Sequence, residues 1–284
     1  MKYNQIVIIG SNGQLGKALK LNYPTAIAVD KDELDITDQN AVDNFDWSGK
    51  KILLNAAAYT NVDGAETSEG RLLAWQINAS AVANLAKASI KHNLLLVHIS
   101  SDYVFNGTRL NHDENELFSP LGVYGQSKAA GDIAISLVPK HYLIRTSWVI
   151  GDGKNFVRTM IELAKRGINP SVVSDQIGRP TFTDELVRGI DFLIKNQCEY
   201  GTYNLSNCGN PVSWSDFTRK IYELKKFNNN VTDITTEEYF KGKELVSARP
   251  LQSSLDCKKI NSLGFKSIDW QIGLENYLKK ELIE

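Results

Sequence analysis

The sequence lacks an excess of charge of either sign. Its 284 residues carry 32 Lys and Arg against 33 Asp and Glu, which leaves a formal net charge of −1. A chain with this balance has no electrostatic footprint for nucleic acid or for an anionic membrane surface. Hydrophobic residues make up 42 % of the chain, so disorder is not expected. We therefore expect neither nucleic acid nor a membrane among its partners.

Cysteine, histidine and long apolar runs are also scarce. The three cysteines, Cys198, Cys208 and Cys257, are scattered, and the four histidines form no pair with metal-ligand spacing. We therefore expect reduced thiols and no metal site. No apolar run approaches the roughly 18 residues that a membrane helix needs. The first residues lead directly into a predicted strand, so no signal peptide is expected and the predicted location is cytoplasmic.

Apolar segments alternate with helical patterns through the first half of the chain. The segments at residues 5–9, 26–29, 51–54, 94–99 and 141–145 are typical of parallel strands that are buried on both faces. Helical periodicity lies between them, at residues 14–22, 39–45, 71–92 and 123–137. The alternation predicts an α/β fold, a doubly wound parallel sheet of the Rossmann type.

The second half of the chain has a looser pattern. Helices are expected at residues 155–166, 184–195, 214–227 and 272–282. We interpret this half as a smaller C-terminal α/β domain that binds substrate. The predicted dinucleotide-binding domain covers residues 1–146 and is rejoined by about residues 182–206. The predicted substrate-binding domain covers residues 147–181 and 207–284.

A glycine-rich turn follows the first predicted strand. Gly10, Gly13 and Gly16 form a GxxGxxG pattern that opens the first helix. Glycines there permit a tight turn and a close approach of the backbone to a pyrophosphate, and the helix N-terminus offers free amides. The pattern predicts a dinucleotide site, and its spacing is typical of short-chain dehydrogenases/reductases. A turn that serves only packing is the alternative.

The choice of dinucleotide depends on Asp30, at the end of the second predicted strand. Its carboxylate is placed to accept hydrogen bonds from a ribose 2′-hydroxyl. A carboxylate repels a 2′-phosphate, so NADH is favoured over NADPH, although the neighbouring Lys31 would offset part of that repulsion. Small residues after the third strand, Ala57 and Ala58 among them, would let a cofactor lie against the backbone.

Tyr124 and Lys128 are four residues apart on a predicted helix, so their side chains share a face. An adjacent ammonium favours the phenolate, and Lys128 is therefore expected to lower the pKa of Tyr124. Tyr124 would then donate a proton to an oxygen as hydride reaches the carbon that bears it. Taken alone, this spacing also fits a pair without function on a helix surface. The glycine-rich turn and the Ser-Ser-Asp strand end that precede the pair favour chemistry.

Polar side chains end the fourth predicted strand, where parallel sheets bind ligands. The Ser101 hydroxyl would bond the reacting oxygen and tune Tyr124, and plain turn formation is the alternative. Asn78, in a predicted long helix, either holds a group near this site or faces solvent. His98, within the same strand as Ser101, is expected to be a core histidine rather than a catalytic one.

Several ordered blocks resemble those of the dTDP-4-dehydrorhamnose reductases, a family of extended short-chain dehydrogenases/reductases. The resemblance runs from residue 5 to about residue 280. It rests on NAAAYTNVD at residues 55–63, SSDYVFNG at 100–107, PLGVYGQSK at 120–128, RTSWV at 145–149, DQIGRPT at 175–181 and ARP at 248–250.

The resemblance implies reduction of the C4 keto group of dTDP-4-dehydro-L-rhamnose to dTDP-L-rhamnose by NADH or NADPH. It implies Tyr124 as the proton donor and Lys128 as its partner on the nicotinamide ribose. Ser101 stands where the family usually has threonine, which keeps the hydroxyl and loses the methyl group that limits its rotamers. The implied cofactor-binding residues are Gly10, Asn12, Gly13, Gln14, Leu15, Gly16, Asp30, Asp35, Ile36, Ala57, Ala58, Tyr59 and Thr60, with Tyr124 and Lys128.

The resemblance also implies a substrate site. Asp102 and Trp148 would contact the deoxysugar of the dTDP-linked 4-keto-6-deoxysugar, together with Ser101. Arg179 and Arg249 would bind the diphosphate through charge-assisted hydrogen bonds, with surface ion pairing as the alternative.

Related functions stay open at this point. Sugar 4,6-dehydratases carry an Asp-Glu pair at the corresponding strand end, whereas Asp102 is followed by Tyr103, which argues against dehydration. A reductase with a 6-deoxy-talose product, an epimerase, and a non-catalytic nucleotide-binding regulatory subunit are the alternatives. A homodimer is compatible with the sequence.

Overall fold

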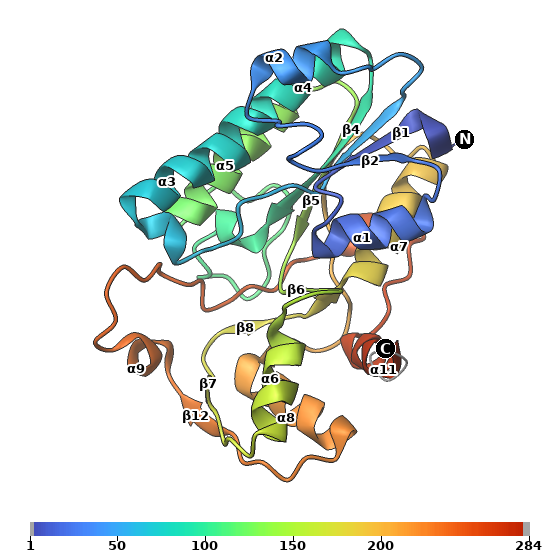
Figure 1. The fold of residues 1–284 in the computed structure, drawn as a ribbon. Coiled ribbons are helices and arrows are strands. Elements are labelled where there is room, and N and C mark those ends of the chain that lie inside the picture. Colours follow the sequence, from blue (N-terminus) through green and yellow to red (C-terminus); the bar gives the residue numbers. More distant parts are fainter. Residues whose placement is uncertain (1–2, 281–284) are drawn as a thin grey trace.

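A computed structural model describes residues 3–280, and a six-stranded parallel sheet forms its centre (Figure 1). Neighbouring strands lie in the order β10-β5-β4-β3-β1-β2. The chain runs from β1 to one neighbour, β2, and then returns to the other neighbour, β3. The carboxyl ends of β1 and β3 therefore open a crevice of the kind in which such sheets bind ligands. The strands are β1 (Ile6–Ile9), β2 (Ile27–Val29), β3 (Ile52–Asn55), β4 (Leu95–Ser101), β5 (His141–Thr146) and β10 (Gly201–Asn204).

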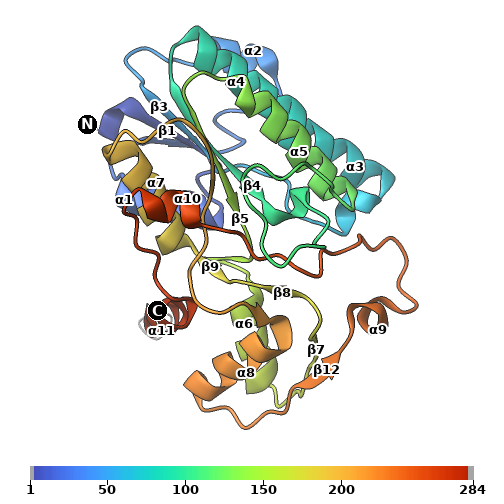
Figure 2. The ribbon, with the colours of Figure 1, turned by 180° about the vertical axis from the view of Figure 1, so that it is seen from behind.

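Helices cover both faces of the sheet, as Figures 1 and 2 show from opposite sides. Side chains alternate along a strand, so Ile6 and Ile8 enter one core cluster while Val7 and Ile9 enter the other. The first cluster packs under α1 and α7, the second under α2, α4 and α5. The predicted doubly wound Rossmann sheet is confirmed. These helices are α1 (Gln14–Asn22), α2 (Gln39–Asn44), α4 (Ala81–Lys91), α5 (Val123–Ser136) and α7 (Thr183–Lys195).

The rest of the chain forms a smaller region below the sheet in Figure 1. Its core surrounds the fully buried Phe217. The helices there are α6 (Phe156–Lys165), α8 (Trp214–Lys225), α9 (Thr236–Phe240) and α11 (Trp270–Lys280), and α10 (Lys258–Ser262) packs near β10. Short strands pair as β6 (Val149–Ile150) with β9 (Thr181–Phe182), β7 (Ser171–Val173) with β12 (Thr232–Ile234), and β8 (Ile177–Gly178) with β11 (Val212–Ser213).

Two sequence predictions concern the second half of the chain, namely the end of its last helix and its division into domains. Residue 282, the predicted end of the last helix, lies outside the described residues. The sheet is completed by β10, which follows the β6–β9 pair of the smaller region along the chain. The division into domains at residues 146, 182 and 206 stays a prediction.

The helix expected at residues 71–92 is divided. Helix α3 (Ser68–Trp75) runs into a π-helical turn, Gln76–Ser80, before α4 begins at Ala81. The backbone is thus helical from Ser68 to Lys91, as the periodicity predicts, but it contains a wider turn that the periodicity does not show. In this turn Asn78 lies inward, where it is 1 % exposed and forms hydrogen bonds with Tyr59 and Ser127. Turns of this kind concentrate at functional sites.

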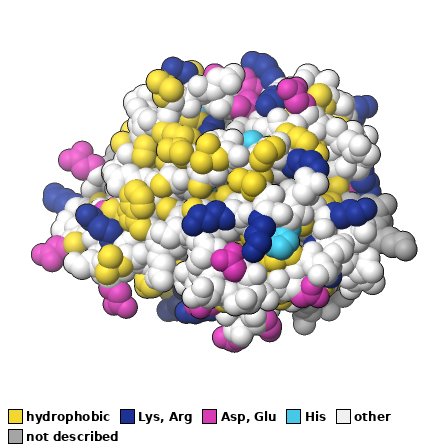
Figure 3. All heavy atoms as spheres, turned by 90° about the horizontal axis from the view of Figure 1, so that it is seen from above, with side chains coloured by type: hydrophobic (Ala, Val, Ile, Leu, Met, Phe, Trp, Pro, Cys, Tyr) yellow, Lys and Arg dark blue, Asp and Glu magenta, His cyan; other side chains and the backbone are white. Residues whose placement is uncertain are grey.

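No helix within residues 3–280 combines the length and the apolar composition that a bilayer crossing requires. Large apolar side chains are nevertheless exposed on α4 and on α5 and its C-terminal end, including Ile90 at 52 %, Ile133 at 56 % and Leu137 at 72 %. Figure 3 shows hydrophobic side chains gathered on the face seen from above, with lysines and arginines between them. A homodimer stays a prediction.

Candidate functional site

Two cavities lie along the carboxyl edge of the sheet. We name them by their lining: the aspartate cavity, about 360 Å³, and the tyrosine cavity, about 530 Å³. Gly13, Ala56 and Ala58 line both, so the two are adjacent. Of the sequence-predicted residues, the aspartate cavity holds Gly10, Gly13, Asp30, Asp35, Ile36, Ala57 and Ala58. The tyrosine cavity holds Gly13, Gln14, Leu15, Ala58, Thr60, Ser101, Asp102, Tyr124, Lys128 and Trp148.

The glycine-rich turn forms the floor between the cavities. Gly10 has φ +74°, and a Cβ there would lie 2.6 Å from the Ala57 nitrogen. At Gly16 a Cβ would lie 2.0 Å from the Gly10 carbonyl oxygen. Both positions therefore require glycine, one for a left-handed backbone and the other for the contact between helix α1 and the turn. Asn12, Gly16 and Tyr59 support this edge without lining either cavity.

Asp30 is held in place at the end of β2. One carboxylate oxygen accepts the Asn12 N–H at 2.8 Å and the other accepts the Lys31 N–H at 2.9 Å. Asp35 accepts both the N–H and the hydroxyl of Thr37, and these bonds lower its pKa. Two carboxyl groups, those of Asp30 and Asp35, thus face the aspartate cavity. Acceptors of this kind suit the hydroxyl groups of a ribose.

The end of β4 supplies the polar wall of the tyrosine cavity. Ser101 caps the short 3₁₀ turn Asp102–Val104. Its hydroxyl oxygen accepts a hydrogen bond from the Tyr103 N–H at 3.2 Å, and its hydroxyl group donates one to Asp102 Oδ1 at 3.0 Å. Asp102 is 2 % exposed, and this burial raises its pKa to about 6. Helix α5 packs closely here, because a Cβ at Gly125 would lie 2.2 Å from the Tyr103 carbonyl oxygen.

Tyr124 and Lys128 both face this cavity from α5, as the spacing predicts. Their electrostatics differ from the prediction. Burial raises the pKa of Tyr124 to about 12, with a Ser101 hydrogen bond as a smaller opposing effect. Burial lowers the pKa of Lys128 to about 8. The expectation that Lys128 lowers the pKa of Tyr124 is therefore wrong, since the loss of hydration dominates and the Lys128 amine is directed at the Ile99 carbonyl oxygen, 2.6 Å away.

Asn78 ties two walls of the site together. Its Oδ1 accepts the Tyr59 N–H at 2.9 Å, and its Nδ2 donates to the Tyr59 carbonyl at 3.1 Å and to Ser127 Oγ at 3.0 Å. Ser127 in turn bonds the Tyr124 carbonyl at 2.7 Å. Of the two roles left open by the sequence, the structure supports the buried one, in which Asn78 joins the loop after β3 to helix α5.

Two tryptophans form the far wall of the tyrosine cavity. Trp148, predicted as a sugar contact, lies there together with Trp214, which the sequence analysis did not single out. The indole rings are stacked, with centroids 3.5 Å apart. Trp214 opens helix α8, far along the chain from every motif, and no local pattern marks it.

The two predicted diphosphate ligands lie elsewhere. Arg179 lines a separate cavity of about 240 Å³ and donates to the backbone carbonyls of Gly209 and Leu255. The structure does not bring Arg179 into the tyrosine cavity. Arg249 donates to Asp63 Oδ1 at 2.7 Å, and its guanidinium lies 6.0 Å from the ring of Tyr103, which lines the cavity. Arg249 is thus adjacent to the cavity without lining it.

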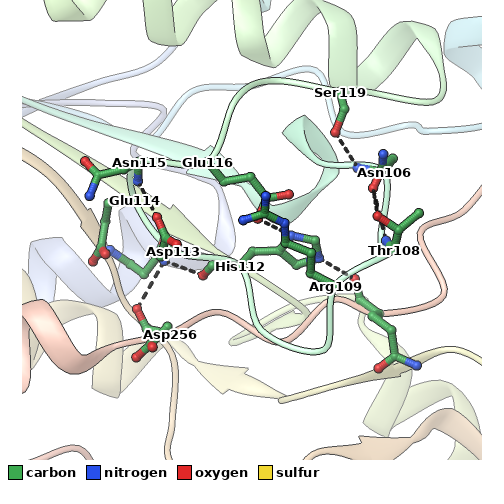
Figure 4. A network of polar contacts seen from close by, with 12 residues as sticks. Asn106, Thr108, Arg109, His112, Asp113, Glu114, Asn115, Glu116, Ser119 and Asp256 are labelled. Atoms are coloured by element: carbon green, nitrogen blue, oxygen red, sulfur yellow. Dashed lines mark hydrogen bonds and ion pairs between the residues drawn. The ribbon is translucent and has the colours of Figure 1, made fainter.

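A buried network anchors the loop between β4 and α5 (Figure 4). The side chain of fully buried His112 lies 2.9 Å from Glu116 Oε2 and 3.0 Å from the Gln252 carbonyl oxygen. The His112 carbonyl accepts the Asp256 N–H at 2.8 Å. The loop that follows Ser101 and Asp102 is thereby fastened to the C-terminal part of the chain.

Comparisons with known proteins identify the family of this chain. A family model described as the RmlD substrate binding domain matches residues 4–283. A dTDP-4-dehydrorhamnose reductase from Aggregatibacter actinomycetemcomitans is 38 % identical, with 96 % of this chain and 97 % of that protein covered. This chain belongs to the dTDP-4-dehydrorhamnose reductase family. It is an oxidoreductase, as the sequence predicted.

Solved structures place the fold in the same family. A dTDP-4-dehydrorhamnose reductase from Bacillus anthracis, crystallised in complex with NADP, has a TM-score of 0.90 and 38 % identity, with 97 % of this chain and 98 % of that chain covered. A UDP-glucose 4-epimerase from Thermus thermophilus, with NAD, has a TM-score of 0.76 at 15 % identity, covering 95 % of this chain and 96 % of that one. The second likeness shows the Rossmann-type fold alone.

Proposed function

We propose that this reductase family member converts the C4 keto group of dTDP-4-dehydro-L-rhamnose to the alcohol of dTDP-L-rhamnose, with NADH or NADPH as reductant. The observation that carries the proposal is that Tyr124, Lys128 and Ser101 line one cavity, which shares lining residues with the aspartate cavity. A proton donor thus lies beside a site suited to a dinucleotide. We propose a sugar nucleotide as the substrate because the relatives of this chain are named dTDP-4-dehydrorhamnose reductases.

The residues present fit a dinucleotide. In the glycine-rich turn no side chain covers the backbone where the two cavities meet, so a pyrophosphate could approach the backbone closely there. The carboxyl groups of Asp30 and Asp35 line the aspartate cavity. When bound, the reduced nicotinamide supplies the hydride for C4. We propose that Asp30 favours NADH, because its carboxylate repels a 2′-phosphate.

Tyr124 acts as the proton donor in this proposal. With its pKa raised to about 12, its phenol holds its proton at neutral pH and delivers it to the oxygen that forms at C4. The Ser101 hydroxyl binds the same oxygen, while Asp102 and Trp148 contact the deoxysugar. Arg249, beside Tyr103, is the arginine proposed for the diphosphate.

The test follows the absorbance of NADH mixed with the protein and dTDP-4-dehydro-L-rhamnose. Oxidation is expected, and Tyr124→Phe should reduce turnover by roughly 10²–10⁴-fold while leaving the fold intact. Turnover of the variant within tenfold of wild type contradicts the role of Tyr124. Product analysis distinguishes dTDP-L-rhamnose from the 6-deoxy-talose isomer, and cofactor binding without any oxidation favours a regulatory subunit.

The cofactor preference has its own test. Asp30→Asn should raise kcat/KM for NADPH relative to NADH by about tenfold, because it removes one unit of negative charge near the 2′-position. Asp46→Asn is the matched control, since Asp46 is a carboxylate outside both cavities. An unchanged NADPH-to-NADH ratio in Asp30→Asn contradicts the proposed preference.

A further inference from the structure

His98 is a buried titratable group beside the site that the proposed reaction does not use. It lies on β4 and is 0 % exposed, as its interpretation as a core histidine requires. Its ring, however, lies between two polar groups of the site region. Nδ1 is 2.9 Å from Asn55 Nδ2, and Nε2 is 3.5 Å from Lys128 Nζ.

The Asn55 side chain determines where the His98 proton resides. Asn55 Oδ1 accepts the Ala57 N–H at 3.1 Å, so its NH₂ group is the end that faces His98. An amide NH₂ only donates, and His98 Nδ1 must therefore accept. A neutral imidazole carries one proton, which then sits on Nε2 and points toward Lys128.

This tautomer distinguishes the two protonation states of Lys128. An ammonium has three donors and no acceptor, so it cannot receive the His98 Nε2–H. A neutral amine has a lone pair that can receive this proton while the amine still donates to the Ile99 carbonyl oxygen. We propose that His98, with its tautomer fixed by Asn55, is a positioning residue that disfavours the ammonium form of Lys128 and so makes that ammonium a stronger proton donor.

The other titratable groups around Lys128 do not strongly stabilise its ammonium form. Asp132, one turn further along α5, attracts the ammonium, but its Oδ2 is bonded to Arg145 Nε of β5 at 3.1 Å. Tyr124, one turn earlier, is neutral because burial raises its pKa. Burial and the Lys128 charge both lower the pKa of His98 well below its usual range, so His98 stays neutral. The neutral His98 and the lowered pKa of Lys128 are thus mutually consistent.

The inference deepens the proposed function and rests on it for its catalytic meaning. After Tyr124 gives its proton to the substrate oxygen, the phenolate must recover one. Lys128 supplies that proton: an N–H bond on its ammonium breaks and the phenol O–H bond re-forms. The remaining amine accepts a hydrogen bond from the His98 Nε2–H, which keeps its proton. Lys128 then regains a proton from the solvent, which is the proton that the overall reduction consumes.

The first experiment reads the tautomer without any turnover. Protein labelled with ¹⁵N in its four histidines is measured by NMR, and the His98 signals are assigned by their loss in His98→Gln. We expect a pyrrole-type Nε2 and a pyridine-type Nδ1 that do not change across neutral pH. A proton on Nδ1, or a His98 that titrates near its ordinary pKa, overturns the inference.

The second experiment inverts the tautomer. Asn55→Asp replaces the donor with a carboxylate, which draws a proton onto His98 Nδ1 and leaves Nε2 free to accept from an ammonium. The titration midpoint of Lys128, followed through ¹³C-labelled lysine and assigned with Lys128→Met, should rise by about one pH unit or more. A midpoint that stays in place overturns the inference.

A matched control separates the tautomer from added charge. Asn204 is equally buried, on β10, where its Nδ2 donates to the His112 and Asp256 carbonyl oxygens. Asn204→Asp should leave the Lys128 midpoint unchanged, and an equal rise there contradicts the inference. If wild-type protein oxidises neither NADH nor NADPH with the sugar nucleotide, the proposed function fails. The wild-type tautomer measurement still decides the inference on His98, even should Asn55→Asp not fold.

Discussion

The indole of Trp148 lies flat on that of Trp214, with ring centroids 3.5 Å apart and ring planes 12° apart. Trp148 also has φ +47°, a left-handed conformation that costs a non-glycine residue about 1–2 kcal/mol. Gly178 also lies close to this ring, because a Cβ there would be 2.8 Å from Trp148 Cε2. The orientation of Trp148 is therefore imposed by residues distant in the chain rather than by its own backbone preference.

This stacking predicts that Trp214 acts through Trp148. Trp214→Ala should raise the KM for the sugar nucleotide by about tenfold, with a smaller effect on kcat, since an aromatic pair contributes about 0.5–1.5 kcal/mol beyond area burial. Steady-state kinetics of Trp148→Ala, Trp214→Ala and the double variant measure this. The double variant should be no worse than Trp148→Ala alone. Fully additive losses, or an equal rise in KM in the control Trp75→Ala, contradict the coupling.

The buried carboxyl of Asp102 predicts a pH-dependent effect on stability. Its folded pKa is about 6, whereas an aspartate in the unfolded chain titrates near 4. Between these values the folded state binds more protons, so wild-type stability falls as the pH rises through this window. Asp102→Asn should therefore increase the free energy of unfolding by on the order of 2–3 kcal/mol at neutral pH.

Urea denaturation at two pH values checks this prediction. The advantage of Asp102→Asn over wild type should be present above about pH 6 and should disappear near pH 4. An advantage of the same size at both pH values would point to packing rather than to the carboxyl. The same variant should bind the sugar nucleotide less well, because Asp102 lines the tyrosine cavity.

Two glycines with nearly the same φ angle allow the cost of backbone strain to be measured apart from the cost of a steric contact. Gly10 has φ +74° and lies against Ala57, whereas Gly49 has φ +70° and has no atom within 4 Å of the place that a Cβ would occupy. Gly49→Ala should lose about 1–2 kcal/mol of stability from backbone strain alone. Gly10→Ala should lose more and should also weaken dinucleotide binding by at least about tenfold, measured by calorimetry. Equal stability losses and unchanged binding in Gly10→Ala contradict the assigned role of the turn.

The sequence alone was sufficient for the strands and helices of the first half of this fold, up to β5. The apolar run of β1 serves two cores because alternate side chains enter opposite faces, and that pattern needs no tertiary information to be read. The helix expected at residues 14–22 is observed as Gln14–Asn22. The i, i+4 spacing likewise predicted that Tyr124 and Lys128 share a face, since helix geometry is local.

Only the tertiary structure decided the environment of those residues. The pKa of Tyr124 depends on how much water the fold removes, and that loss outweighs the charge four residues away. The inward turn at Asn78 and the stack of Trp214 on Trp148 join segments that no local pattern relates. Arg179 is bound by backbone carbonyls that its own motif does not contain. Secondary structure and shared faces follow from short-range periodicity, whereas burial, hydrogen-bond partners and protonation depend on contacts between distant parts of the chain.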